Sequence, residues 1–164
     1  MNDDRGAEQG PGQSPGFLLW KVTNRWQRSI VAALKPVDLT HVQFVLLASI
    51  WWLSRDNKPL PTQRDVADHA GTDPMMTSQV VRVLEPRDLI TRGRDPRDGR
   101  AWRLSTTARG AQVAERAIEI VETADRAFFA NAEPTQLVCT LRSLAAARPP
   151  DPHPHPTVLS AASR

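Results

Sequence analysis

The sequence of 164 residues predicts a mainly α-helical chain with one small β-hairpin wing, a winged helix-turn-helix flanked by N- and C-terminal dimerisation helices. Two observations carry this prediction. Two short helical segments are joined by the turn "GTD" at 71–73, which is the spacing of a helix-turn-helix. Two β-like runs then flank "RDPRDGR" at 94–100, and the Pro, Asp and Gly of that segment favour a turn.

The first half of the chain reads as two helices. Apolar residues repeat at intervals of three and four from Phe17 to Leu34, which indicates an amphipathic helix that ends before Pro36. Thr40 and Gln43 have the spacing of a capping box at the start of the next helix. The run Phe44–Leu53 is apolar on nearly every side, so we expect it at the centre of the fold. At ten residues it is too short to cross a bilayer.

The helix-turn-helix has its own start and stop signals. Thr62 and Asp65 predict the start of a short helix, and Gly71 predicts its end. Asp73 is placed to cap the following helix, which begins with a proline and runs over about 74–85.

Beyond the helix-turn-helix we expect a hairpin and two more helices. The strands are "DLITRG" and "AWRLST", with Trp102 and Leu104 anchoring the returning strand to the core. Thr107 is expected to cap a long helix that reaches Phe128. Pro134 restarts the chain in a final helix.

These elements divide the chain into three regions. We expect a disordered arm over 1–16, one domain over 17–147 and a Pro-rich disordered tail over 148–164. Within the domain, the winged helix-turn-helix covers about 40–106. The dimerisation helices cover about 17–34 and 107–147, because their apolar stripes exceed what the small central module can cover.

Composition and motifs narrow the function classes. The formal net charge is +3, and five Arg against two Asp between Arg92 and Arg103 make the same excess locally. No signal peptide or nucleophile-and-base motif is visible, which favours a cytoplasmic protein that is not an enzyme and needs no cofactor. No metal site is predicted, since His153 and His155 stand without further ligands. The single Cys139 is expected to be a buried, inert thiol.

The second helix of the helix-turn-helix carries side chains that suit base edges. A helical wheel puts Met76, Val80, Val83 and Leu84 on the core side. The opposite side carries Met75, Ser78, Gln79 and Arg82. Arginine pairs with guanine and glutamine with adenine, serine reaches a base or a phosphate, and methionine can touch a thymine methyl. The alternative is an ordinary amphipathic helix with a solvated polar face.

Three segments together resemble the MarR family of bacterial regulators. "DPRDGRAWRLSTTARG" (95–110) resembles the family's wing signature, and "LTHVQFVLLASI" (39–50) resembles the start of its second helix. "GTDPMMTSQVVRVLEPRDLI" (71–90) resembles its recognition helix and exit. The resemblance covers about 17–147. The chain departs from the family pattern at Pro86, at Asp88 where glycine is usual, at Gly99 and at Thr106.

The resemblance implies roles for the wing residues. A narrow A·T-rich minor groove attracts inserted arginine. Arg97 and Arg100 flank the turn, and the family match points to Arg100 as the minor-groove residue with Asp98 holding its guanidinium. The strand arginines, Arg92, Arg94 and Arg103, are expected to meet phosphates or water, and Arg94 is counted among the DNA-contact candidates. The alternative is a solvated, salt-bridged hairpin, although exposed pairs add little stability.

The resemblance also implies a homodimer that reads a palindrome, and a small, often anionic aromatic ligand bound between the dimer helices and the DNA module. The candidate lining residues are Trp20, Trp26, His41, Trp51 and Trp52, which could equally be plain core.

The sequence therefore predicts a dimeric, ligand-relieved repressor whose partner is double-stranded DNA and which does not contact a membrane. The alternative is a winged-helix protein-interaction module that binds an acidic protein partner. Gln79 and Arg82 favour DNA.

Overall fold

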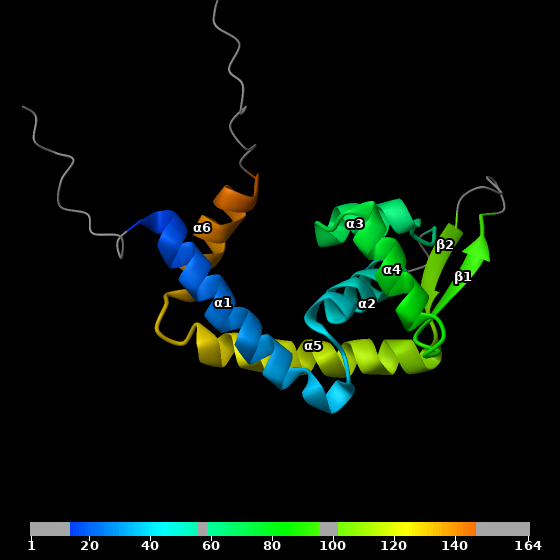
Figure 1. The fold of residues 1–164 in the computed structure, drawn as a ribbon, viewed down its shortest axis with the longest axis horizontal. Helices are drawn as coiled ribbons and strands as arrows, with labels where there is room; N and C mark the ends of the chain where they lie inside the picture. The colour runs from blue at the N-terminus through cyan, green and yellow to red at the C-terminus, as the bar shows by residue number, and fades with distance from the viewer. Residues whose placement is uncertain (1–13, 56–58, 96–101, 147–164) are drawn as a thin grey trace, which may run out of the picture. The chain divides into compact units, whose positions relative to one another are not determined.

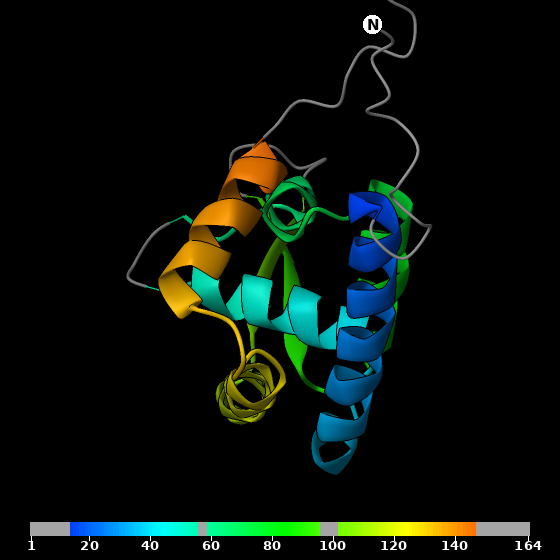
Figure 2. The same cartoon turned by 90° about the vertical axis from the view of Figure 1, so that its left-hand side faces the viewer.

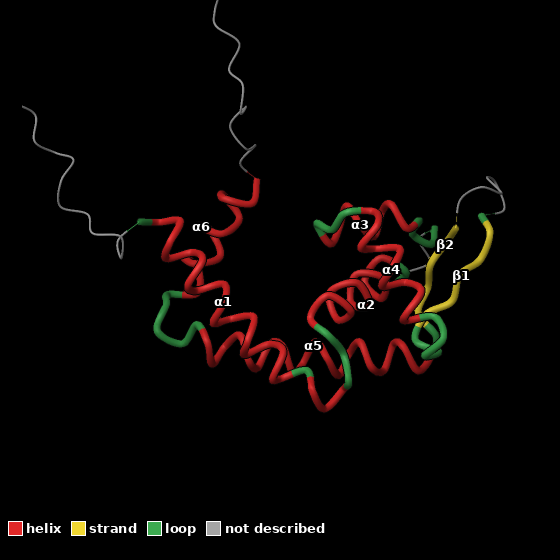
Figure 3. Tube along the Cα trace, viewed as in Figure 1, coloured by secondary structure: helices red, strands yellow, loops and turns green. Residues whose placement is uncertain are grey.

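The computed structural model describes residues 14–55, 59–95 and 102–146, and these residues form six helices and one two-stranded sheet (Figure 3). The chain divides after Phe128 into two compact units. The first unit contains α1 (Pro15–Ala33), a 3-10 turn (Lys35–Val37), α2 (His41–Leu53), α3 (Gln63–Ala70), α4 (Pro74–Leu84), β1 (Ile90–Arg94), β2 (Trp102–Thr106) and α5 (Ala108–Phe128). The second unit contains α6 (Pro134–Ala146). The predicted fold class is confirmed.

Helix α1 begins two residues earlier than the sequence analysis expected. Its first residue is Pro15 and its N-cap is Ser14, so residues 14–16, which were expected in the disordered arm, belong to the start of the helix. Proline at the first helical position has a backbone angle already suited to a helix and lacks an N–H that would need a partner. Of the expected arm, residues 1–13 lie outside the described residues, as does the expected tail over 148–164.

Capping boxes start α2 and α3 as predicted. At α2, the Thr40 hydroxyl accepts a hydrogen bond from the Gln43 backbone N–H, and the Gln43 side chain accepts one from the Thr40 N–H. At α3, Thr62 and Asp65 make the same reciprocal pair. Each box satisfies two backbone donors that a helix start leaves without partners. These two helix starts therefore follow from local sequence alone.

Helix α2 lies at the centre of the first unit, as its all-round apolar sequence predicts. It packs against α1, α3, α4, α5 and β2, and in both ribbon views it lies between α5 and α3 (Figures 1 and 2). Leu46, Leu47 and Ile50 are fully buried in it. The remaining core comes from every neighbouring element, including Ile30, Val66, Val81, Leu84, Leu89, Leu104, Ala114 and Ala117.

The turn between α3 and α4 has the predicted chemistry. Gly71 ends α3 with φ 66°, a left-handed conformation that glycine adopts without steric cost. A carboxylate oxygen of Asp73 accepts a hydrogen bond from the Met76 N–H at 2.8 Å and caps α4. Helix α4 then ends at Leu84, before Pro86.

The segment that follows α4 is hydrogen-bonded to the connection between α1 and α2. The Arg87 guanidinium donates to the carbonyl and the carboxylate of Asp38, at 2.7 and 2.9 Å, and to the Gln43 side chain at 3.3 Å. Asp38 and Asp88 both have positive φ, 51° and 56°. Asp88 stands where the family pattern has glycine, so the backbone there keeps the left-handed turn even though the side chain differs.

Helix α5 begins directly beneath the hairpin (Figure 1). The Thr107 hydroxyl accepts from the Gly110 N–H at 2.8 Å and donates to the Asp88 carbonyl at 2.7 Å, which confirms it as a cap. Gly110 lies so close to the strand that a Cβ there would be 1.7 Å from the Leu89 carbonyl oxygen. This glycine therefore permits the close approach of α5 to the start of β1.

In the second unit, Glu133 caps α6. Its carboxylate accepts from the Gln136 and Thr135 N–H groups, and these hydrogen bonds lower the pKa of Glu133. Cys139 is exposed, so the expectation of a buried thiol is wrong. Val138, Leu141 and Leu144 of α6 are exposed as well, and Leu137 is half-buried.

Candidate nucleic-acid interface

Helix α4 buries two of the four residues that the helical wheel placed on the core side, Val80 and Leu84, and two others in place of the remaining pair. Its buried residues are Thr77, Val80, Val81 and Leu84, whereas Met76 and Val83 are 42% and 45% exposed. A pattern based on hydrophobicity alone leaves out a buried threonine such as Thr77. Thr77 can be buried because its hydroxyl donates to the Asp73 carbonyl and shares a hydrogen bond with the Thr72 hydroxyl.

The exposed face of α4 keeps the residues predicted to read bases. Met75, Gln79 and Arg82 are exposed, and Ser78 lies half-buried at the edge. Met76 and Val83 join this face and were missed by the sequence analysis. Residues 77, 80, 81 and 84 have the i, i+3, i+4, i+7 spacing of a buried helix face. Counting Thr77 as a core residue would therefore have placed Met76 and Val83 on the exposed side. The face thus combines two hydrogen-bonding side chains with apolar ones suited to thymine methyls.

The two strands of the wing are antiparallel, and Arg94 pairs with Trp102 and Arg92 with Leu104. Leu104 is fully buried and anchors the hairpin to the core, as predicted. Trp102 is 39% exposed, so the expectation that it also anchors the core is wrong. Its ring instead lies against the guanidinium groups of Arg94 and Arg92, at 4.3 and 5.2 Å from the ring centroid. A cation over an indole face is attracted by the ring quadrupole.

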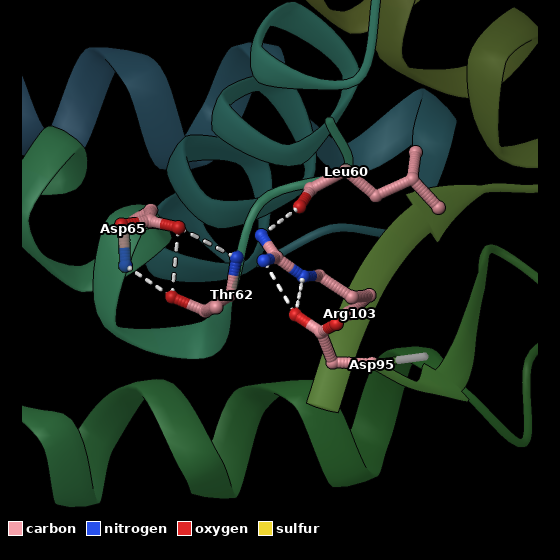
Figure 4. A network of polar contacts seen from close by, with 5 residues as sticks. All are labelled: Leu60, Thr62, Asp65, Asp95 and Arg103. Carbon is pink, nitrogen blue, oxygen red and sulfur yellow. Dashed lines mark hydrogen bonds and ion pairs between the residues drawn. The ribbon is translucent and has the colours of Figure 1, made fainter. Parts of the chain in front are cut away.

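Arg92 and Arg103 also form ion pairs within the protein. Arg92 forms a 2.8 Å ion pair with Glu85, the C-cap residue that follows α4. Arg103 forms an ion pair with Asp95 and donates to the Leu60 carbonyl (Figure 4). The expectation that these arginines meet only phosphates or water is therefore corrected. The carboxylates of Glu85 and Asp95 pair with these arginines in the folded protein. The alternation of residues along a strand does not predict such partners.

The predicted wing tip falls in a part of the chain that the structure does not describe. Arg97, Asp98 and Arg100, with the turn "DPRDG" beyond Asp95, lie outside the described residues. Their predicted roles stay predictions.

Residues 59–62, which we call the linker before α3, contact the base of the wing. The Leu104 N–H donates to the Pro61 carbonyl at 2.9 Å, and Thr62 forms an antiparallel bridge with Arg103. At the same point the Thr62 backbone and hydroxyl donate to Asp65, which lowers the pKa of that carboxyl below its ordinary value. Asp65 thus stays ionised, and the α3 cap, the linker and β2 form one connected structure.

Two of the five predicted ligand residues lie together between α1 and α2. The Trp26 and His41 rings meet edge to face, with centroids 5.0 Å apart. The Trp26 indole N–H donates to Asp125 of α5 at 2.7 Å. Burial lowers the pKa of His41 below its ordinary value, against the opposing effect of the Asp125 charge.

The other three residues make separate contacts. Trp51 and Trp52 have ring centroids 6.5 Å apart, and the Arg55 guanidinium lies over both rings. Trp20 stacks on Phe17 near the start of α1. The five residues therefore form three separate groups and do not line one common pocket in the contacts described. Hollows of about 420, 480 and 580 Å³ in the first unit are lined by other residues of α1, α2, α5 and the connections between elements. The ligand site stays a prediction.

Neither a metal cluster nor a membrane helix is found in the described ranges. Among residues 14–55, 59–95 and 102–146, no three His, Cys, Asp or Glu side chains gather as metal ligands would. Over the same ranges, the helices are too short or too polar to cross a membrane.

Comparisons with known proteins agree with the geometry of the hairpin and the helix-turn-helix. The model of the MarR family matches residues 39–102. The chain is 46% identical over 123 residues to an HTH-type transcriptional regulator of Bacillus subtilis named YdcH, which covers 75% of this chain and 83% of that protein. It is 32% identical over 110 residues to an HTH-type transcriptional repressor of Mycobacterium tuberculosis, which covers 67% of this chain and 76% of the relative.

The fold is also found among solved structures. The transcriptional repressor CouR bound to a 23-mer DNA duplex matches with a TM-score of 0.70 and 25% identity, over 82% of this chain and 92% of that one. CouR from Rhodococcus jostii RHA1 bound to p-coumaroyl-CoA matches with a TM-score of 0.71 and 26% identity, over 84% and 96%. Together with the wing and the capped helix-turn-helix, these similarities show that the chain belongs to the MarR family of transcriptional regulators.

Proposed function

We propose that this regulator is a homodimeric repressor that binds a palindromic operator and is released by a small ligand. The observation that carries the proposal is the division of α4 into two faces. One face is locked into the core through Val80, Val81 and Leu84, and the other presents Gln79 and Arg82 to solvent. An α-helix fits the major groove, where such side chains distinguish base pairs.

In this proposal each part of the interface has its own role. Gln79 and Arg82 contact base edges, Ser78 a base or a phosphate, and Met75 a thymine methyl. Arg94 contacts the phosphate backbone from the wing. Arg97 and Arg100 reach the neighbouring minor groove, with Asp98 orienting Arg100. The DNA-bound structure of CouR supports a DNA role for this fold.

A homodimer would cover the apolar surface that single chains leave exposed. Helix α1 exposes a group of large apolar side chains near its start, and α6 exposes another along its length; they are Phe17, Leu18, Leu19, Trp20, Val22, Val138, Leu141 and Leu144. Monomeric proteins rarely expose such groups. In a dimer with two-fold symmetry, two copies of α4 would meet half-sites about one helical turn apart. Sedimentation at micromolar concentration tests this, and a monomer would contradict it.

Release by a ligand is supported by CouR, which is solved both on DNA and with p-coumaroyl-CoA. In this chain Trp26 and His41 supply aromatic surface where α1, α2 and α5 meet, and Trp51 and Trp52 supply a separate aromatic pair on α2. A ligand would have to bind the DNA-free arrangement of the dimer more tightly than the DNA-bound one, because only a difference in affinity shifts the equilibrium. The protein would act in the cytoplasm, where its DNA target lies.

Selection of bound sequences from a pool of random duplex DNA is the direct test. We expect an enriched palindrome with two half-sites. Gln79→Ala and Arg82→Ala should each weaken binding to it by about 1–3 kcal/mol and relax the preference at one base pair. Arg126→Ala, an exposed arginine in the last turn of α5, is the matched control. Failure to enrich any sequence would instead favour a module that docks on an acidic protein.

A further inference from the structure

We propose that Arg103 and Asp95 are positioning residues, whose ion pair holds the base of the wing against the linker before α3 and so fixes where the wing meets DNA. The proposal rests on the DNA-binding function above. Neither residue is assigned a contact with DNA. Their role is to set the geometry from which the wing tip departs.

The geometry of the pair is that of a clamp (Figure 4). Asp95 is the last described residue before the tip, and it is only 6% exposed. The Nε and one terminal nitrogen of Arg103 lie 2.6 and 2.5 Å from the same carboxylate oxygen, Oδ2. The other terminal nitrogen donates to the Leu60 carbonyl at 2.5 Å. One guanidinium thus joins the end of β1, the start of β2 and the linker.

The linker passes this restraint on to the helix-turn-helix. Leu60 is followed by Pro61, which accepts from the Leu104 N–H, and by Thr62, which caps α3. The face of the sheet that carries Arg92 is held separately, because Arg92 pairs with Glu85 at the end of α4. The wing base is therefore attached to both helices of the helix-turn-helix. A wing held in this way approaches DNA together with α4 and not independently of it.

Charge alone gives no reason for this pair. Asp95 places a negative charge on a hairpin expected to face a polyanion, and Arg103 only cancels it. Removing Asp95 should then improve DNA binding if net charge were what mattered. The planar fork of arginine, which can satisfy two partners at fixed angles, is what the contacts use. A lysine in its place keeps the charge but cannot reach both partners at once.

The two explanations predict opposite signs for Asp95→Asn. If the pair is a clamp, the variant binds the selected duplex about tenfold more weakly, the loss expected for one displaced base contact. If only charge matters, it binds as tightly or more tightly. Arg103→Lys should also weaken binding, although the charge is kept. The double variant Asp95→Asn/Arg103→Ala should lose less affinity than the sum of the two single losses, since both changes break the same contact.

The exposed pair Arg116 and Glu119 on α5 provides matched controls. Its nitrogen and oxygen are 3.0 Å apart, so Glu119→Gln and Arg116→Ala make the same charge changes away from the wing. We expect both controls to keep the affinity of the unaltered protein. Circular dichroism and thermal unfolding confirm that each variant folds before its affinity is compared.

Hydrogen exchange tests the clamp without DNA. Amides of β1 and β2 near the tip should exchange faster in Asp95→Asn and Arg103→Lys, while amides of α5 stay protected. Unchanged exchange in the hairpin, or binding as tight as that of the unaltered protein, would overturn the clamp. If the unaltered protein enriches no duplex at all, the proposed DNA function fails, and the exchange rates still decide whether the pair holds the wing.

Discussion

The indole N–H of Trp26 donates a 2.7 Å hydrogen bond to a carboxylate oxygen of Asp125, joining α1 to α5 across 99 positions of sequence. The His41 ring stands edge-on to the same indole, with ring centroids 5.0 Å apart. His41 is the first residue of α2, the central helix on which the helix-turn-helix packs. Three residues thus connect the predicted dimerisation helices to the DNA-binding module.

Trp26→Phe should lower the free energy of unfolding by about 1–2 kcal/mol, because it leaves the half-buried Asp125 carboxylate without its donor while keeping an aromatic ring. Urea denaturation followed by circular dichroism measures the change. Trp52→Phe, at an exposed tryptophan on α2, is the control and should shift the midpoint little. Equal shifts in the two variants would show that the hydrogen bond contributes nothing measurable.

The lowered pKa of His41 predicts a dependence of stability on pH. Burial is the main cause, so the folded protein favours the neutral imidazole. As the pH falls below about 6.5, the unfolded chain binds the proton first, and the free energy of unfolding decreases. In His41→Gln, the free energy of unfolding should depend less steeply on pH between about pH 7 and pH 5. Asp125→Asn removes the opposing charge and should lower the pKa of His41 further.

Gly110→Ala should destabilise the protein by about 3 kcal/mol or more, since its Cβ would collide with the Leu89 carbonyl and force α5 away from the hairpin. Gly93→Ala is the matched control in the neighbouring strand. A Cβ at Gly93 meets nothing within 4 Å, so the substitution should be neutral or slightly stabilising. Thermal unfolding distinguishes the two, and similar midpoints would contradict the close approach.

Asp88→Gly should raise the free energy of unfolding by about 0.5 kcal/mol, because it relieves a left-handed backbone conformation at φ 56°. The flexibility of glycine in the unfolded chain offsets part of the gain. Asp38→Gly relieves similar strain at φ 51° but also breaks the ion pair with Arg87. We therefore expect it to be less stable than Asp88→Gly in urea denaturation. The reverse order would mean that the Arg87 contact adds no stability.

Arg100→Ala should weaken operator binding with little change in the thermal unfolding midpoint, if this residue is the groove contact that the resemblance of the wing sequence implies. A gel-shift titration measures the affinity. The slope of log affinity against log salt becomes shallower by about 1 for each phosphate that the protein no longer neutralises. A change in slope therefore tells a phosphate contact from a purely minor-groove one. Unchanged affinity would remove Arg100 from the interface.

Local signals in the sequence predicted most of the fold. The capping pairs at Thr40 and Thr62, the left-handed Gly71 and the aspartate cap at Asp73 all lie within three or four residues of their partners. Their hydrogen bonds depend on backbone geometry that a short segment sets by itself. The apolar run of α2 likewise predicts a central position, because no amphipathic arrangement could leave one side of it in water.

Contacts between segments far apart in the chain could not be predicted from the sequence. Arg92 pairs with Glu85 after α4, and Arg103 contacts Asp95 and the Leu60 carbonyl of the linker. The alternation of residues along the strands is the same whether or not such partners exist, so it does not predict them. The face that α4 buries depended on Thr77, whose polar side chain hid it from a hydrophobicity pattern.

What the sequence by itself determined is the order of the helices and strands, the local signals that cap most of the helices, and that five arginines fall within one short segment around the hairpin. Only the tertiary structure decided which of those arginines are held by the protein. An ion pair forms when folding brings two charges within a few ångströms, and that distance depends on how whole elements pack, not on the spacing of residues along the chain. In this protein, packing places Arg103, which the sequence assigns to phosphates or water, in an ion pair with Asp95 and a hydrogen bond to the Leu60 carbonyl.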